Sequence, residues 1–223
     1  MTENKPVFGL FDPSAETDRS ERDLPHWFQP EVAVFVTFRT ADSLPKSALA
    51  RMQAEVRDWL LRHGIPFPPN LPLPDAGEVT ANLRQQYRQL KNRLFQWELD
   101  SCHGECLLRE QKYSKIVMQS LRHFDGVRYD LDCAVVMPNH VHALVQFRPP
   151  TTCKKQCRSW LTYTARILNQ QLGRSGPFWQ SEAFDHLVRT VEQFEFLQRY
   201  IRQNGPQAKL NPGEYHFWKR GWE

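Results

Sequence analysis

The sequence predicts an α+β protein built around a small antiparallel sheet. Residues 31–39 read EVAVFVTFR, a nearly continuous apolar run that is typical of a central, buried strand. Residues 127–147 form two more apolar strands around Pro138-Asn139, a pair that suits the middle of a tight turn and so predicts a β-hairpin. Apolar residues at helical spacing predict five helices, over 47–63, 79–99, 110–124, 153–172 and 191–204.

Length and composition set the broad class. The chain has 223 residues, of which 40% are hydrophobic and 24% charged, and this fits one elaborated globular domain. No apolar run approaches the ~20 residues of a membrane span, and residues 1–27 lack the basic-then-apolar pattern of a signal peptide. Five cysteines, an odd number, indicate reduced thiols. We therefore expect a cytoplasmic protein with no membrane partner.

The two ends of the chain are expected to be tails. Residues 1–29 are polar and interrupted by proline, and their six acidic and three basic residues give a charge of −3. Such a composition is typical of a flexible segment. We expect the folded domain to cover residues 30–210 and a C-terminal tail to cover 211–223.

Residues 47–99 carry two apolar stripes and no groups at the spacing of a site. The stripe of the first helix includes Leu49, and that of the second includes Trp97. The proline-rich segment 64–77 between the helices is expected to be an extended connector. We therefore predict an inserted antiparallel helix pair that serves packing rather than chemistry.

A zinc site is an alternative use of the cysteines. Cys102, His103 and Cys106 lie in a predicted turn, and Cys153 with Cys157 could complete a ligand set. Their spacing does not match a standard zinc finger, so the pattern alone gives little support to this site.

The hairpin carries two histidines that share a face. His140 and His142 lie two residues apart in a strand, so their side chains point the same way, about 7 Å apart along the chain. Both imidazoles could then reach one metal ion or one phosphate, and we expect them on the solvent-facing side of the strand. The alternative is a pair of surface histidines without a shared ligand.

Basic residues gather in the second half of the chain. Residues 152–210 carry nine basic and four acidic residues, a net charge of +5, and this favours a polyanionic partner. We expect the helix 153–172 to lie beside the site and to contact the phosphates of such a partner; the alternative is a solvated basic surface. The candidate phosphate contacts are Lys154, Lys155, Arg158 and Arg166. Residues 178–188 then predict another strand.

The last helix has a clear start and stop. Thr190 and Gln193 form a capping box, in which each side chain satisfies a backbone amide of the other residue. Gly205-Pro206 is expected to end the helix. Its apolar stripe, expected to dock on the sheet, consists of Phe194, Leu197 and Ile201.

Tyr200 and Asn204 lie one helical turn apart at the edge of this stripe. If the helix meets the sheet face bearing His140 and His142, two imidazoles and one amide oxygen could hold a divalent cation beside a tyrosine. Because the phenol pKa is about 10, a nucleophilic tyrosine needs a metal that neutralises charge on a scissile phosphate. Covalent attachment would preserve the bond energy for rejoining. The alternative role for Tyr200 is a half-buried packing aromatic.

Two motifs carry a resemblance to a known family. MPNHVHALV at 137–145 and YIRQNGPQAKL at 200–210 resemble the IS200-like, single-tyrosine "HUH" transposases, and most closely the REP-associated tyrosine transposases. The likeness runs from 31–39 through GRSGPFWQSEAFDHLVR at 173–189 to Leu210. It implies a ferredoxin-like sandwich with a central antiparallel sheet. It also implies cleavage and joining of single-stranded or palindromic hairpin DNA through a 5′-phosphotyrosine, with Mg²⁺ or Mn²⁺.

By position, the resemblance makes His140 and His142 metal ligands, Tyr200 the nucleophile and Asn204 the third ligand. The chain departs from the family pattern where Gly205 follows Asn204 in place of proline and where Lys209 replaces a glycine. A nucleoid-associated monomer or homodimer is expected. Two other functions stay open: a domesticated, non-catalytic DNA-binding protein on the same fold, and a metal-dependent phosphohydrolase that does not use the tyrosine.

Overall fold

The structure, a computed structural model, describes residues 8–21, 25–65 and 80–221. The chain divides into two compact units, one formed by Met1–Ala41 with Cys106–Glu223 and the other by Asp42–Glu105. The proline-rich connector expected at 64–77 lies, beyond residue 65, outside the described residues. No helix in the described residues is long and apolar enough to cross a bilayer.

The first unit contains an antiparallel sheet with the strand order β6-β3-β5-β4-β7. Its strands are β3 (Ala33–Arg39), β4 (Tyr129–Val136), β5 (His140–Phe147), β6 (Phe184–Leu187) and β7 (His216–Lys219). Helix α3 (Gln111–Arg122) lies between β3 and β4 in the chain, and α4 (Cys153–Leu172) between β5 and β6. Strands β3 to β6 therefore follow the strand–helix–strand order and the sheet order of a ferredoxin-like sandwich, as predicted.

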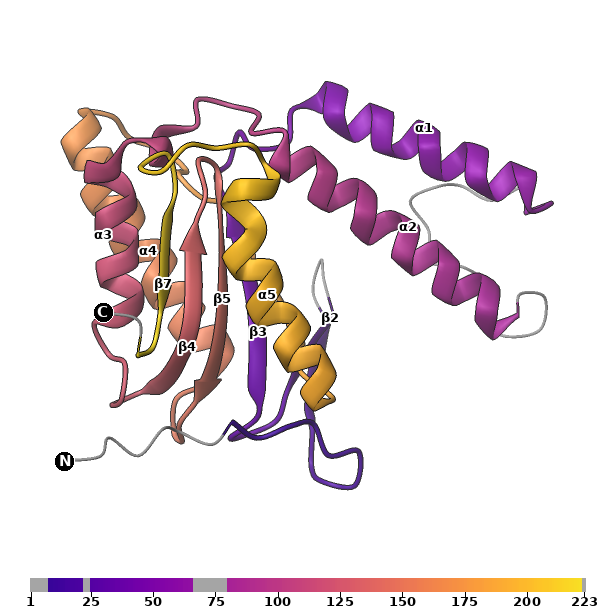
Figure 1. The fold of residues 1–223 in the computed structure, drawn as a ribbon, viewed down its shortest axis with the longest axis horizontal. Helices are drawn as coiled ribbons and strands as arrows, with labels where there is room; N and C mark the ends of the chain where they lie inside the picture. Colours follow the sequence, from indigo (N-terminus) through magenta and orange to yellow (C-terminus); the bar gives the residue numbers. More distant parts are fainter. Residues whose placement is uncertain (1–7, 22–24, 66–79, 222–223) are drawn as a thin grey trace. The chain divides into compact units, whose positions relative to one another are not determined.

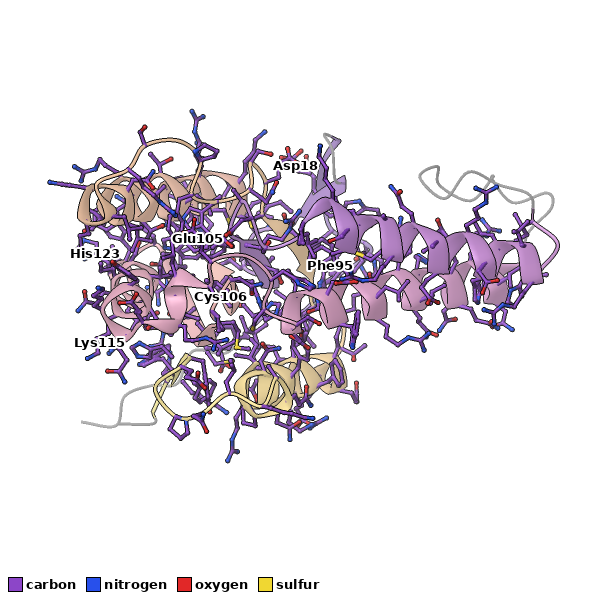
Figure 2. The ribbon with its side chains drawn as sticks, turned by 90° about the horizontal axis from the view of Figure 1, so that it is seen from above. Asp18, Phe95, Glu105, Cys106, Lys115 and His123 are labelled. Atoms are coloured by element: carbon purple, nitrogen blue, oxygen red, sulfur yellow. The ribbon has the colours of Figure 1, made fainter. Side chains whose placement is uncertain are left out.

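Helices cover both faces of the sheet. Helices α3 and α4 pack together on one face, and α5 (Val191–Gln207) packs on β4 and β5 from the other (Figure 1). Figure 2 shows α4 and α5 on opposite sides of the unit, with Lys115 and His123 marking α3. Each face of the sheet has its own hydrophobic core, and alternate side chains of a strand belong to different cores. In β3, Val34, Val36 and Phe38 pack toward α3 and α4, and Ala33 and Phe35 toward α5.

The predicted hairpin is present between β4 and β5. Val136 pairs with Val141, and the N–H of Met137 donates to the carbonyl oxygen of His140 at 2.8 Å. Pro138 and Asn139 are therefore the two central residues of a tight turn. This turn fixes the register that places both histidines on one face.

The unit Asp42–Glu105 is the predicted helix pair, formed by α1 (Lys46–Arg62) and α2 (Ala81–Asp100). The helices are antiparallel, because each end of one packs on the opposite end of the other. The contacts join Val56 and Leu60 to Tyr87 and Leu90, and Ala48 to Leu99. Leu49 and Trp97, expected within the apolar stripes, are 41% and 60% exposed instead.

Both expected tails contribute regular structure to the described residues. Within 1–29, β1 (Asp18–Glu21) pairs with β2 (Pro25–Phe28), and the N–H of Phe11 donates to the carbonyl of Val188. Beyond residue 210, β7 extends the sheet beside β4. The predicted strand 178–188 is shorter than expected, because only β6 is a strand and Trp179 makes one isolated bridge with Thr40.

Helix α5 begins as predicted but ends three residues later. Thr190 accepts from the N–H of Gln193, while the Gln193 side chain accepts from the N–H of Arg189. The expected stop at Gly205-Pro206 is wrong, because both residues lie inside the helix. Pro206 lacks the N–H that would bond the carbonyl of Arg202, so the helix loses one backbone hydrogen bond there, one residue before its end.

Gly205 has a packing role. A Cβ atom at this position would lie 2.5 Å from the ring of Tyr215. The absence of a side chain thus lets the C-terminal segment press against the last turns of α5. The residue that follows Asn204 is small because of this close approach.

Candidate active site

The two histidines of β5 lie under α5. His140 and His142 are both 0% exposed, and their ring centroids are 4.7 Å apart. The prediction that they face solvent is therefore wrong. They are buried because Leu197 and Ile201 of α5 dock on this face of the sheet.

His142 is fixed by two residues of the neighbouring strand β3. Its Nδ1 lies 2.7 Å from the hydroxyl oxygen of Thr37, its cross-strand partner. Its ring stacks on Phe35 with centroids 5.1 Å apart. When Nδ1–H donates to Thr37, the lone pair of Nε2 is left free to accept a proton or bind a cation.

His140 is oriented by the turn residue before it. Its Nδ1 lies 2.8 Å from Oδ1 of Asn139. An amide oxygen only accepts, so Nδ1 carries the proton and Nε2 carries a lone pair. Within the described residues, this Nε2 has no hydrogen-bond partner. His140 thus presents an unprotonated Nε2, and His142 does so when its Nδ1–H donates to Thr37.

Helix α5 brings Tyr200 and Asn204 to the histidines. The Tyr200 hydroxyl lies 3.3 Å from Nε2 of His142, and it donates to that nitrogen when Thr37 accepts from the opposite one. Asn204 is 0% exposed, and in the described part of the chain neither of its amide atoms has a hydrogen-bond partner. The structure therefore places the four predicted residues in one site.

Burial keeps both imidazoles neutral. It lowers the pKa of His140 to about 3, while the nearby Asn204 amide acts in the opposite direction. Burial, together with the charge that His140 would carry, lowers the pKa of His142 well below its usual value. Proton binding therefore does not compete for either Nε2 near neutral pH.

The unpaired buried atoms fit a divalent cation. A buried polar group without a partner costs roughly 1–3 kcal/mol. Among the residues that the structure describes, the Nε2 of His140 and both amide atoms of Asn204 have no such partner. In the described residues, no three His, Cys, Asp or Glu side chains come together as a metal site. Two imidazoles and one amide oxygen would therefore need further oxygen ligands from a substrate.

Four contributing residues were not predicted. Thr37 and Phe35 hold His142, and Asn139, assigned only to the turn, orients His140. His186 of β6 lies 5.2 Å from the Phe35 ring, and burial, with the charge of Arg189, lowers its pKa to about 4. The lone polar threonine in the apolar run VFVTF was the one available signal.

The basic residues of α4 do not lie beside this site. Lys154, Lys155, Arg158 and Arg166 are exposed, but α4 covers the opposite face of the sheet from α5. The expectation that they flank the site is wrong. Alternate side chains of the strands point to opposite faces of the sheet, and α4 and α5 pack on different faces.

The proposed zinc ligands are engaged elsewhere. Cys153 and Cys157 lie within α4 with their sulfur atoms 3.7 Å apart. In the other unit, Nε2 of His103 lies 2.7 Å from a carboxylate oxygen of Glu98. The described residues hold no cluster of three such ligands.

Comparison with known proteins finds a match over the segment that contains the site. Residues 110–204 match the model of a family described as "Transposase IS200 like", and this segment contains all four residues of the site. The resemblance predicted from the sequence is thus confirmed for 110–204. No curated protein matches the chain. Among solved structures, "Structure of the REP associates tyrosine transposase bound to a REP hairpin" shares 12% identity, with a TM-score of 0.40, and covers 82% of this chain and 71% of that one.

Proposed function

We propose that the protein is a metal-dependent transposase and single-stranded DNA endonuclease that cleaves and rejoins DNA through a 5′-phosphotyrosine at Tyr200. The observation that carries this proposal is the 3.3 Å distance between the Tyr200 hydroxyl and Nε2 of His142. The unpaired atoms of His140 and Asn204 are buried in the same site.

The chemistry follows from the position of the phenol. In the cleavage step the Tyr200 oxygen bonds to phosphorus, the bond to the 3′ oxygen breaks, and the phenolic proton ends on the released 3′ hydroxyl. Reversal with a new 3′ hydroxyl rejoins the strand without a high-energy cofactor. The 3.3 Å contact places the phenolic oxygen beside the nitrogen of His142 that would hold the cation. Because this nitrogen has a single lone pair, it accepts the phenolic hydrogen bond only while no cation is bound.

His140, His142 and Asn204 would hold the divalent cation. When bound, it would neutralise charge on the scissile phosphate. Because imidazole ligands favour softer metals than Mg²⁺, we expect Mn²⁺ to support activity at least as well as Mg²⁺. Thr37 and Asn139 serve this function by fixing the two imidazoles with Nδ1 protonated.

The inferred substrate is single-stranded DNA that contains a palindromic hairpin. This inference rests on the family match over 110–204 and on the surplus of basic residues in the second half of the chain. A DNA substrate in turn makes a nucleoid-associated location the natural one for this protein.

One observation favours a second candidate function. Both histidines are 0% exposed, so a phosphate can reach them only if α5 or a loop near it moves. A non-catalytic DNA-binding protein on the same fold would need no such movement. It would bind DNA without forming any covalent product.

The test is a denaturing gel with single-stranded oligonucleotides that contain a palindrome, in the presence of Mn²⁺. A 5′-phosphotyrosine retains the fragment on the 3′ side of the cut, so a 3′-end label should stay with the protein and a 5′-end label should be released. Bound DNA without either product would favour the non-catalytic alternative. Cleavage without an adduct would indicate a hydrolase.

A further inference from the structure

A second concave site lies on the other face of the sheet from Tyr200. It is a cavity of about 650 Å³ lined by residues of α4, of the segment 176–185 and of strands β1 and β2. Asp18, labelled in Figure 2, is one of the lining residues. Asp185 of β6 lines it, whereas the next residue, His186, contacts Phe35 on the face bearing the histidines. The edge strand β6 thus separates the two sites.

The lining combines aromatic rings with exposed cations. Trp27 and Phe28 of β2 line the cavity, are partly buried and pack against the core on the α4 side. Lys154 and Arg158, one turn apart on α4, also line it, and both side chains are exposed. The lining is more apolar than polar, and its two α4 cations are exposed to solvent.

Acidic groups restrict which ligand fits. The carboxyl groups of Glu182 and Asp185 are part of the same lining. They disfavour a phosphate deep inside the cavity, whereas they tolerate a neutral heterocycle that carries N–H donors. This distribution of charge favours a ligand whose planar ring lies in the cavity and whose phosphates lie near the exposed cations.

We propose that this cavity binds an unpaired nucleobase of a single-stranded DNA segment, with the adjoining phosphates at Lys154 and Arg158. Its volume lies within the roughly 300–1,000 Å³ of ligand pockets. Stacking of bases on aromatic side chains is a mode of single-stranded DNA binding that tolerates any base. The inference rests on the proposed function for the identity of the ligand as DNA.

Lys154 and Arg158 would then bind DNA although they lie on the other face of the sheet from Tyr200. DNA held here would be anchored on one face of the sheet while its scissile phosphate reacts on the other. Loss of the cavity contacts should therefore weaken affinity for DNA and leave the reaction at Tyr200 unchanged once DNA is saturating.

The test measures binding of a fluorescent single-stranded oligonucleotide to the full chain by anisotropy. Trp27→Ala and Arg158→Ala should each raise Kd at least about fivefold, and Trp27→Phe, which keeps an aromatic ring, should restore most of the affinity. Lys155→Ala is the matched control for Arg158→Ala, because this exposed cation of α4 is not part of the lining. It should change Kd less.

The possible outcomes separate this inference from the proposed function. Unchanged Kd in Trp27→Ala and Arg158→Ala, with an adduct still forming at Tyr200, would overturn the base-binding cavity alone. Weakened binding in both variants, with no adduct in the unaltered protein, would overturn the nuclease and keep the cavity. If Trp27→Ala does not fold, the Kd of Arg158→Ala tests the cavity alone. This variant should fold, because the Arg158 side chain is exposed. An unaltered protein that binds no single-stranded DNA would refute both.

Discussion

The phenolic oxygen of Tyr200 lies 3.3 Å from Nε2 of His142, across the interface between α5 and the sheet. The two residues are 58 positions apart in the chain. Their contact depends on Leu197 and Ile201, which dock α5 on the sheet, and on Thr37, which fixes the imidazole. Docking of α5 on the sheet thus brings the proposed nucleophile and the proposed metal ligands together.

Thr37 should act through His142. Thr37→Val keeps the shape of the side chain but removes the hydroxyl that lies 2.7 Å from Nδ1. We expect metal-dependent adduct formation to fall about 10–100-fold and the free energy of unfolding to fall by about 1–3 kcal/mol. Thr37→Ser, which retains the hydroxyl, is the control. Equal activity in the valine and serine variants would show that Thr37 does not position the histidine.

Removal of a histidine should now cost stability as well as activity. Because His142 is completely buried, His142→Ala leaves a cavity, and we expect a loss of about 2–4 kcal/mol in urea unfolding. A solvent-facing histidine would cost less to remove. His140→Gln is milder and tests the metal directly. Mn²⁺ should raise the Tm of the unaltered protein but not that of His140→Gln; an equal shift in both would place the metal elsewhere.

Gly205→Ala should disturb the last turns of α5. The added methyl group would meet the Tyr215 ring at 2.5 Å, so the helix or the ring must move. We expect a loss of about 1–3 kcal/mol in stability and weaker activation by Mn²⁺, because Asn204 is the preceding residue. Tyr215→Ala added to Gly205→Ala should recover part of the stability. Full stability in the single variant would mean that the contact is not tight.

Asp100, at the end of α2, should make the helix pair less stable at neutral pH. Burial raises its pKa to about 6, and within the described residues its Oδ1 has no hydrogen-bond partner. A carboxyl whose pKa is higher in the folded state contributes stability below its unfolded pKa of about 4. That contribution is lost as pH rises through the folded value.

Asp100→Asn should therefore stabilise the protein at pH 7 by about 1–2 kcal/mol, a figure reduced for partial solvent screening. The gain should shrink toward zero as pH falls from 6 to 4. Chemical unfolding of both proteins across this range gives the difference. A gain that does not change with pH would show that the aspartate is ionised normally in the folded state.

Local chemistry explains what the sequence could predict. The Pro138-Asn139 turn and the Thr190–Gln193 cap are defined by residues within a few positions of each other. The turn occurs as expected, and Thr190 caps the N–H of Gln193 as expected, whereas the Gln193 side chain accepts from the N–H of Arg189 and not from that of Thr190. The apolar run that became β3 and the stripe of α5 likewise follow from periodicity. These elements sufficed to bring the four residues of the site together.

Tertiary packing explains what the sequence could not predict. Whether the face of β5 that carries His140 is covered depends on α5, which is distant in the chain. The opposite face is covered by α4, the helix that follows β5 directly, and periodicity does not show which helix takes which face. In the sequence, Gly205 has the pattern of a helix stop. The structure shows a different reason for the glycine, which is the close approach of the Tyr215 ring. Thr37 is recognisable as a positioning residue only through its cross-strand pairing with His142.

The central claim is that Tyr200 is the nucleophile, and mass spectrometry of trapped protein–DNA conjugates tests it most directly. Tyr200→Phe keeps the ring and its packing on Phe35 and loses only the hydroxyl. The unaltered protein, incubated with a palindromic single-stranded oligonucleotide and Mn²⁺, should give one conjugate, on the peptide that contains Tyr200. Tyr200→Phe should bind the same DNA and give none. A conjugate that persists in Tyr200→Phe, or that maps to Tyr163 on α4, would contradict the mechanism.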